Sequence, residues 1–158
     1  MEISKFSALS PRRKEKALSE MAFCDWTAGT YLYSMLRTDD IGGLFGDNPE
    51  ILMLFEENRL AAFCTYVEMD EIKADDMKPW IGFVYTFPQY RGRRYSGELI
   101  EYAVSLAVKD GYEYVYISSE ERGLYEKYGF EFVGEMQSIH GYITGVFKRR
   151  ITNKSSDR

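Results

Sequence analysis

Apolar residues recur at helical spacing in several parts of the chain, most clearly between residues 96 and 109. In that stretch they follow the i, i+3, i+4, i+7 pattern of an amphipathic helix, and Gly111 stands where a glycine commonly ends one. The stripe consists of Ile100, Ala103, Val104 and Ala107. Ser10 and Pro11 form a helix-start pair, so we expect another helix to begin there. Two further helices are predicted over residues 26–36 and 120–128.

Runs rich in β-branched and aromatic residues alternate with these helical stretches and predict strands. The expected strands are a short one within 1–9, then 50–55, 60–67, 80–87, 112–118, 130–136 and 142–149. Glu57 and Asn58 form a turn between the second and third of them, which predicts a hairpin. Gly82 inside a strand pattern indicates a bulge or a close backbone approach. The glycine-rich segment 37–49 is typical of a loop.

This order of elements predicts an α/β domain around one mixed sheet. We place a single domain at residues 1–152 and a polar tail at 153–158. The length of 158 residues fits one domain, and an aromatic content of 16 % excludes a disordered chain.

The formal net charge of −5 disfavours nucleic acid as a partner. No run of apolar residues is long enough to predict a membrane span. Two cysteines, Cys24 and Cys64, and the single His140 fit neither a metal site nor a disulfide framework. We therefore expect no metal and a reducing, cytoplasmic location.

The segment from Pro88 to Gly97 carries the most chemistry. It contains three arginines within four residues and two glycines, and it lies between a predicted strand and the long helix. Backbone N–H groups and the positive end of a helix meet in such a loop, which favours a bound phosphate or pyrophosphate. A solvated basic turn is the alternative. The segment matches neither a Walker loop nor a dinucleotide fingerprint.

A second segment, Gly123 to Phe130, presents Tyr125 and Tyr128 before Gly129 turns the chain into a strand. Ordinary amphipathic packing explains Tyr128. Tyr125 is also able to donate a proton to a substrate at the end of the preceding strand.

Together the two segments resemble the GNAT superfamily of acyl-CoA-dependent N-acyltransferases. Arg91 to Ser96 is similar to the family's [QR]-x-x-G-x-[GA] motif, and Leu124 to Phe130 is similar to its L-Y-E-K-x-G-F helix. The resemblance implies a mostly antiparallel mixed sheet of six to seven strands, splayed in the middle and flanked by about four helices. Arg94 stands where the family prefers glycine, and Ser118 stands where many members carry asparagine.

The resemblance also implies acetyl-CoA as co-substrate. Its pyrophosphate would lie on the loop formed by Arg91, Gly92, Arg93, Arg94, Tyr95, Ser96 and Gly97. The pantetheine arm would pair with backbone groups of Val84, Tyr85 and Thr86 and pass Ser118.

The implied chemistry is direct attack of a primary amine of a small molecule or peptide on the thioester. Tyr125 is the expected acid for the leaving thiolate. Glu68 and Asp70 follow the third strand and are candidate bases, directly or through water, and Glu68 is preferred because it is closest to the strand end. A solvated acidic loop is the alternative for both, and His140 is a further candidate, although a lone histidine is usually structural.

Cys64 has the features of a small buried apolar residue rather than a nucleophile. Trp26, Tyr31 and Tyr142 are candidates for the acceptor site, although core packing is the alternative for each.

Two other functions stay open at this stage. A non-catalytic CoA-binding module of the same fold is favoured by Arg94, Ser96 and Ser118 and disfavoured by the retained Tyr125. An RNA-binding patch at Arg91 to Arg94 is small for an acidic chain. A monomer and a homodimer are both compatible with the sequence.

Overall fold

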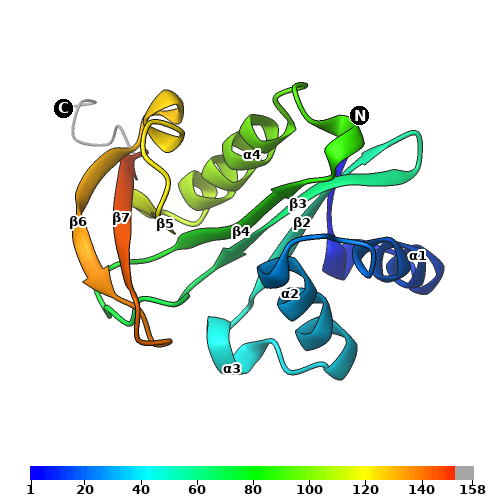
Figure 1. The fold of residues 1–158 in the computed structure, drawn as a ribbon, viewed down its shortest axis with the longest axis horizontal. Helices are drawn as coiled ribbons and strands as arrows, with labels where there is room; N and C mark the ends of the chain where they lie inside the picture. Colours follow the sequence, from blue (N-terminus) through cyan, green and yellow to red (C-terminus); the bar gives the residue numbers. More distant parts are fainter. Residues whose placement is uncertain (152–158) are drawn as a thin grey trace.

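A computed structural model describes residues 1–151 and places seven strands of this part of the chain in one sheet (Figure 1). The strands are β1 (Glu2–Lys5), β2 (Glu50–Glu56), β3 (Arg59–Val67), β4 (Trp80–Thr86), β5 (Tyr114–Ser119), β6 (Glu131–Gln137) and β7 (Ile143–Arg150). Their order across the sheet is β1-β2-β3-β4-β5-β7-β6. Every neighbouring pair is antiparallel except β4 and β5, which are parallel. The mixed, mostly antiparallel sheet and the β2–β3 hairpin are thereby confirmed.

The helices lie on both faces of the sheet, with α4 on one face and α1 to α3 on the other (Figure 1). They are α1 (Pro11–Met21), α2 (Thr27–Thr38), α3 (Gly42–Phe45) and α4 (Tyr95–Lys109). Side chains alternate along a strand, so β2 sends Met53 toward α1 and α2 and sends Leu54 toward α4. Burial on both faces explains why this strand is an unbroken apolar run.

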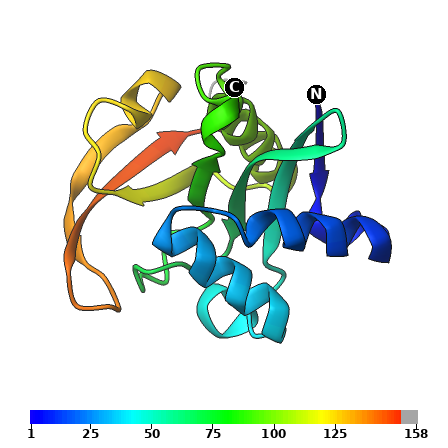
Figure 2. The same ribbon diagram turned by 45° about the vertical axis from the view of Figure 1, so that its right-hand side comes forward.

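The sheet separates between β4 and β5. Trp80 paired with Tyr116 is the one ladder pair that joins these two strands. The pairing of β4 with β3 shifts register between Phe63 and Thr65, and Phe83 adopts a φ of 50° at this bulge. The strands β5, β7 and β6 turn away from β1 to β4 as a second wing (Figures 1 and 2). The expected splay is present, and it opens one edge of β4.

Two predicted elements differ from the structure. The segment expected to be a loop over 37–49 contains the short helix α3. The helix expected over 120–128 is a 3₁₀ turn confined to Tyr125–Tyr128, because Gly123 adopts a φ of 91° just before it. Within residues 1–151, no helix combines the length and apolar content that a membrane crossing requires. The predicted tail at 153–158 lies outside the described residues.

Candidate active site

A cleft of about 1140 Å³ lies where the two wings of the sheet part. Its walls come from the start of α2, the bulge of β4, the end of β5, the 3₁₀ turn and the β6–β7 hairpin. The lining includes Val84 and Tyr85 on β4, Arg91 in the loop, Ser118 on β5 and Tyr125. Eight of the sixteen predicted site residues line the cleft, whereas Glu68, Thr86 and residues 92–97 do not.

The edge of β4 in the cleft is hydrogen-bonded to the loop of residues 91–97, which we call the arginine loop. Arg91 donates from Nε to the carbonyl oxygen of Thr86 at 2.9 Å, and its guanidinium lies 5.6 Å from the ring centre of Tyr85. On their other side, Tyr85 and Thr86 pair with β3. The side of β4 that faces β5 pairs with that strand only at Trp80 among the described residues, so its later backbone groups border the cleft.

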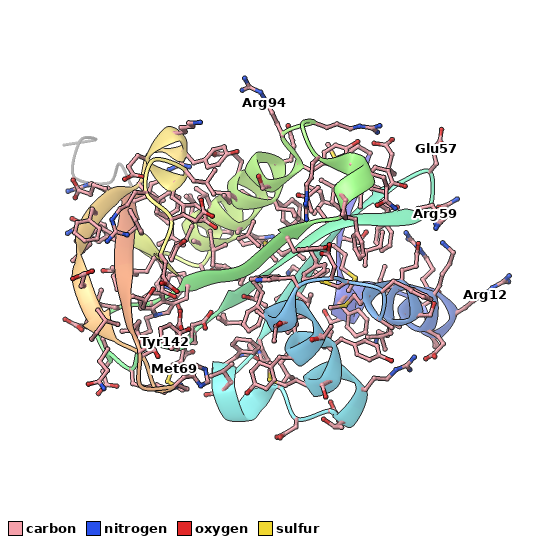
Figure 3. All side chains as sticks on the ribbon, in the orientation of Figure 1. Arg12, Glu57, Arg59, Met69, Arg94 and Tyr142 are labelled. Atoms are coloured by element: carbon pink, nitrogen blue, oxygen red, sulfur yellow. The ribbon has the colours of Figure 1, made fainter. Side chains whose placement is uncertain are left out.

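The loop before α4 turns sharply at two positions. Gly92 has a φ of 86°, and a side chain there would meet open space. Arg94 has a φ of 62°, so the position where relatives prefer glycine does adopt the left-handed conformation here. The side chain of Arg94 points away from the body of the molecule (Figure 3). Any contact between Arg94 and a phosphate would have to come from its backbone or from a different rotamer.

Helix α4 begins with unpaired donors. Its first turn is closed by the N–H of Glu98 bonding to the carbonyl of Arg94, so the N–H groups of residues 95–97 have no partner inside the helix. Gly97 has a further role, because a side chain there would come within 2.8 Å of the Tyr128 ring. The hydroxyl of Ser96 lies 3.5 Å from that of Tyr128. These contacts hold the helix start against the 3₁₀ turn.

Tyr95 was predicted to contact the cofactor, but its side chain packs in the hydrophobic core. It is buried among α4 and sheet residues, and its hydroxyl donates to Glu56. This hydrogen bond also keeps the pKa of Glu56 below its usual range. Only the backbone of Tyr95 is left to contribute to the predicted phosphate-binding loop.

Tyr125 lines the cleft. Its ring packs against Phe130 and Phe147, and the side chain is 8 % exposed. Burial raises the pKa of Tyr125 to about 12, so the hydroxyl keeps its proton at neutral pH. Cys64 is fully buried, and burial also raises the pKa of its thiol, in keeping with an unreactive core residue.

The three acceptor-site candidates all line the cleft. The ring of Trp26 stacks on Tyr85 with centroids 5.7 Å apart and planes 6° from parallel. The hydroxyl of Tyr85 donates to Asp25 at 2.6 Å. Tyr31 extends the same wall from α2. The start of α2 thus forms an aromatic wall with a carboxylate at its edge.

The opposite wall is organised by Glu71, which the sequence did not single out as a site residue. Its Oε2 accepts a 2.6 Å hydrogen bond from Ser118, and its Oε1 accepts one from Tyr142. Its carbonyl accepts from the N–H of Ile139 in the β6–β7 hairpin at 2.8 Å. Burial and the hydrogen bond to Glu71 raise the pKa of Tyr142 to about 12. Figure 3 labels Tyr142 at this end of the molecule.

Glu68 was the preferred candidate base, and the structure places it elsewhere. It lines a separate hollow with Tyr66 and Asp110 and does not line the cleft. The neighbouring carboxylates Asp70 and Glu71 face the cleft instead. The connection turns after Glu68, where the N–H of Met69 bonds to the carbonyl of Phe45 on α3. The sequence pattern around Glu68 does not predict this turn, because it depends on a contact with Phe45, which is distant in the sequence.

Comparison with solved structures supports this fold along nearly the whole chain. An aminoglycoside 6'-acetyltransferase type Ii is 14 % identical with a TM-score of 0.71, over 96 % of this chain and 98 % of that one. An aminoglycoside 6'-N-acetyltransferase complexed with coenzyme A is 12 % identical with a TM-score of 0.68, over 96 % and 98 %. An acyl-CoA N-acyltransferase from Pseudomonas aeruginosa is 20 % identical with a TM-score of 0.63, over 94 % and 97 %.

The sequence comparisons identify the family. No curated protein matched the chain significantly. The model of the acetyltransferase (GNAT) family matches residues 15–130, which include the arginine loop, α4 and the segment around Tyr125. This match covers well over half of the chain and agrees with the splayed sheet. The protein belongs to the GNAT family and is an acyl-CoA N-acyltransferase.

Proposed function

We propose that the protein transfers an acetyl group from acetyl-CoA to a primary amine of a cationic small molecule or peptide. The observation that carries this proposal is the opening between β4 and β5 with Tyr125 beside it. A thioester bound along the free edge of β4 would place its sulfur near the hydroxyl of Tyr125, and the amine would enter from the aromatic and acidic walls.

The residues of the arginine loop fit a pyrophosphate. Gly92 and Arg94 turn the backbone with positive φ, and the first N–H groups of α4 have no partner inside the helix. A helix of 15 residues adds its positive end at the same place. Arg91 is fixed at the cleft by Thr86 and Tyr85, where it would neutralise one phosphate charge.

The cleft favours a positively charged acceptor. Five carboxylates line it, from Asp25, Asp70, Glu71, Glu120 and Glu121, against the guanidinium of Arg91. Trp26, which is 36 % exposed and lies close to Asp25, also suits an alkylammonium group. Two of the similar solved proteins are named for acetylation of aminoglycosides. Aminoglycosides therefore belong among the first amines to test as acceptors.

Transfer needs one acid and one base. The amine nitrogen attacks the thioester carbon, the C–N bond forms and the C–S bond breaks. Tyr125 would donate its proton to the leaving thiolate, because its buried hydroxyl is protonated at neutral pH. The amine must lose a proton as well, since a free alkylamine is charged near neutral pH.

The test is thiol release from acetyl-CoA with a panel of monoamines, polyamines, aminoglycosides and peptide amines. Amine-dependent release with an acetylated product detected by mass spectrometry would establish the reaction. A protein that binds acetyl-CoA tightly in calorimetry but releases no thiol with any amine would be a non-catalytic CoA-binding module instead.

A further inference from the structure

Asp70 is a buried carboxylate whose second oxygen lacks a hydrogen-bond partner in the described structure. The side chain is 6 % exposed and lines the cleft. Its Oδ1 accepts a 2.7 Å hydrogen bond from the N–H of Glu71. No hydrogen bond within residues 1–151 reaches Oδ2. Oδ2 is not one of the fully enclosed polar atoms, and because Asp70 lines the cleft, this oxygen is open to a proton donor there.

The place of Oδ2 is set by Gly82 on β4. A side chain at Gly82 would overlap Oδ2 of Asp70, and it would lie 3.1 Å from Oγ1 of Thr65. Gly82 is directly followed by Phe83, the residue with positive φ at the bulge of β4. The missing side chain therefore makes room for the Asp70 carboxylate at the point where the edge of β4 opens toward the cleft.

Thr65 is the second unusual group in this place. Its hydroxyl is fully buried, and within residues 1–151 it is the one buried side-chain polar atom without a hydrogen-bond partner. Threonine and valine have nearly the same shape, so the hydroxyl is not needed to fill space. It faces the same small region beside Gly82 as Oδ2 of Asp70.

We propose that Oδ2 of Asp70 is the base that accepts the proton lost by the attacking amine, directly or through water in the cleft. This inference rests on the proposed acetyl transfer. The proton passes from nitrogen to Oδ2, directly or through a water in the cleft, while the proton of Tyr125 goes to sulfur. Exchange with solvent then restores both residues.

The surroundings give Asp70 the basicity that this role requires. Burial and the charge of Glu71 raise the pKa of Asp70 to about 7, against the opposing effects of the Glu71 N–H and Lys73. The cleft also contains Asp25, Glu120, Glu121, Arg91 and His140. A base with a pKa near the working pH combines a large ionised fraction with useful proton affinity.

Glu71 is less suited to this role. Both of its oxygens already accept hydrogen bonds, from Ser118 and Tyr142. It joins chain segments across the cleft and acts as a positioning residue. His140 is the remaining group of this type, and its exposed ring stacks on Tyr142 with centroids 6.2 Å apart.

The test measures kcat against pH for the wild type, Asp70→Asn, Thr65→Val and Glu68→Gln with the best amine of the panel. Asp70→Asn keeps the shape and the acceptor for the Glu71 N–H. We expect it to lower kcat by about 10²–10⁴-fold and to remove the loss of activity below about pH 7. Thr65→Val removes a hydroxyl that is enclosed beside Gly82, so it should keep kcat and the loss of activity below about pH 7, and leave the protein at least as stable. Glu68→Gln, outside the cleft, should match the wild type.

Calorimetry with acetyl-CoA checks that each variant is folded and still binds the co-substrate. An Asp70→Asn variant that keeps the wild-type kcat, or that still loses activity below about pH 7, overturns the proposal. His140 would then be the next candidate for the base. A wild type that releases no thiol with any amine removes the proposed acetyl transfer itself, which is a distinct result.

Discussion

The hydroxyl of Ser118 at the end of β5 donates a 2.6 Å hydrogen bond to Oε2 of Glu71 on the β3–β4 connection. Tyr142 of the β6–β7 hairpin donates to the other oxygen of the same carboxylate. One side chain thus joins three chain segments across the end of the splayed sheet. Ser118, where the resemblance to GNAT proteins implies asparagine in many members, is hydrogen-bonded here to the wall of the cleft formed by Glu71 and Tyr142.

Glu71→Gln should weaken acceptor binding more than it slows the chemistry. The amide cannot accept from both Ser118 and Tyr142, so the hairpin loses one of its attachments. We expect the KM for the acceptor to rise about tenfold with kcat changed by a few-fold at most, since hydrogen bonds to charged groups contribute about 1.5–3 kcal/mol. Steady-state kinetics with a saturating acetyl-CoA concentration measures both.

Glu120→Gln is the matched control for Glu71→Gln, because it removes the same charge from a residue that lines the cleft but has no hydrogen bond or ion pair in the described structure. If both variants raise the KM for the acceptor equally, the negative charge of Glu71, and not its hydrogen bonds, would explain the effect. The pair Glu71→Gln and Tyr142→Phe should also be non-additive, since both remove one hydrogen bond.

Gly92→Val should weaken acetyl-CoA binding about tenfold or more. A β-branched residue resists a φ of 86°, so the loop would change its path and its N–H groups would no longer converge. Gly111→Val offers a matched comparison at a φ of 87°, with open space for the side chain and a place outside the cleft.

Both glycine variants should lose about 1–2 kcal/mol of unfolding free energy from the same backbone strain. Only Gly92→Val should lose affinity for acetyl-CoA in calorimetry. Similar affinity losses in the two variants would argue against a phosphate site in this loop.

Tyr125→Phe should lower kcat by about 10²–10⁴-fold while the Kd for acetyl-CoA stays close to that of the wild type. Burial raises the pKa of Tyr125 to about 12, so the hydroxyl is a proton donor throughout the neutral range. Tyr128→Phe is the comparison, because its hydroxyl contacts Ser96 and does not line the cleft. A Tyr125→Phe enzyme with wild-type kcat, when chemistry limits the rate, would exclude Tyr125 as the acid.

Asp70→Asn should stabilise the protein at alkaline pH while it impairs activity. The folded protein holds the Asp70 proton up to a pKa of about 7, whereas the unfolded chain releases it near its ordinary value of 3.8. The folded state therefore binds more protons in this window, and stability falls as pH rises from about 4 to about 7.

The asparagine variant should lack that loss and gain up to about 4 kcal/mol above pH 7. Urea denaturation at about pH 5 and about pH 8 measures the difference, with Glu68→Gln as the comparison. A variant less stable than the wild type at both pH values would contradict the raised pKa.

The local pattern of apolar and turn residues was sufficient to predict most of the helices and strands. The apolar stripe from Ile100 to Ala107 predicts α4 because a helix must bury one face, and the turn at Glu57 and Asn58 predicts the β2–β3 hairpin. Gly82 was expected at a bulge or a close approach, and it lies at both. The 3₁₀ turn at Tyr125–Tyr128 was overpredicted as a helix, because one amphipathic turn resembles the start of a longer helix.

The sequence by itself determined the order of the elements, the positive loop before α4 and the pair of motifs that indicate the GNAT family. Those features depend on neighbours within a few residues. Which carboxylate reaches the cleft was decided only by the tertiary structure. Glu68, Asp70 and Glu71 stand close together in the sequence, yet the turn at Met69 sends Glu68 to another hollow, Gly82 receives Asp70, and Ser118 and Tyr142 hold Glu71. Gly82 is 12 residues from Asp70 along the chain, and Ser118 and Tyr142 are still farther from Glu71. The periodicity of a helix or strand relates only residues a few positions apart, so it cannot predict these contacts.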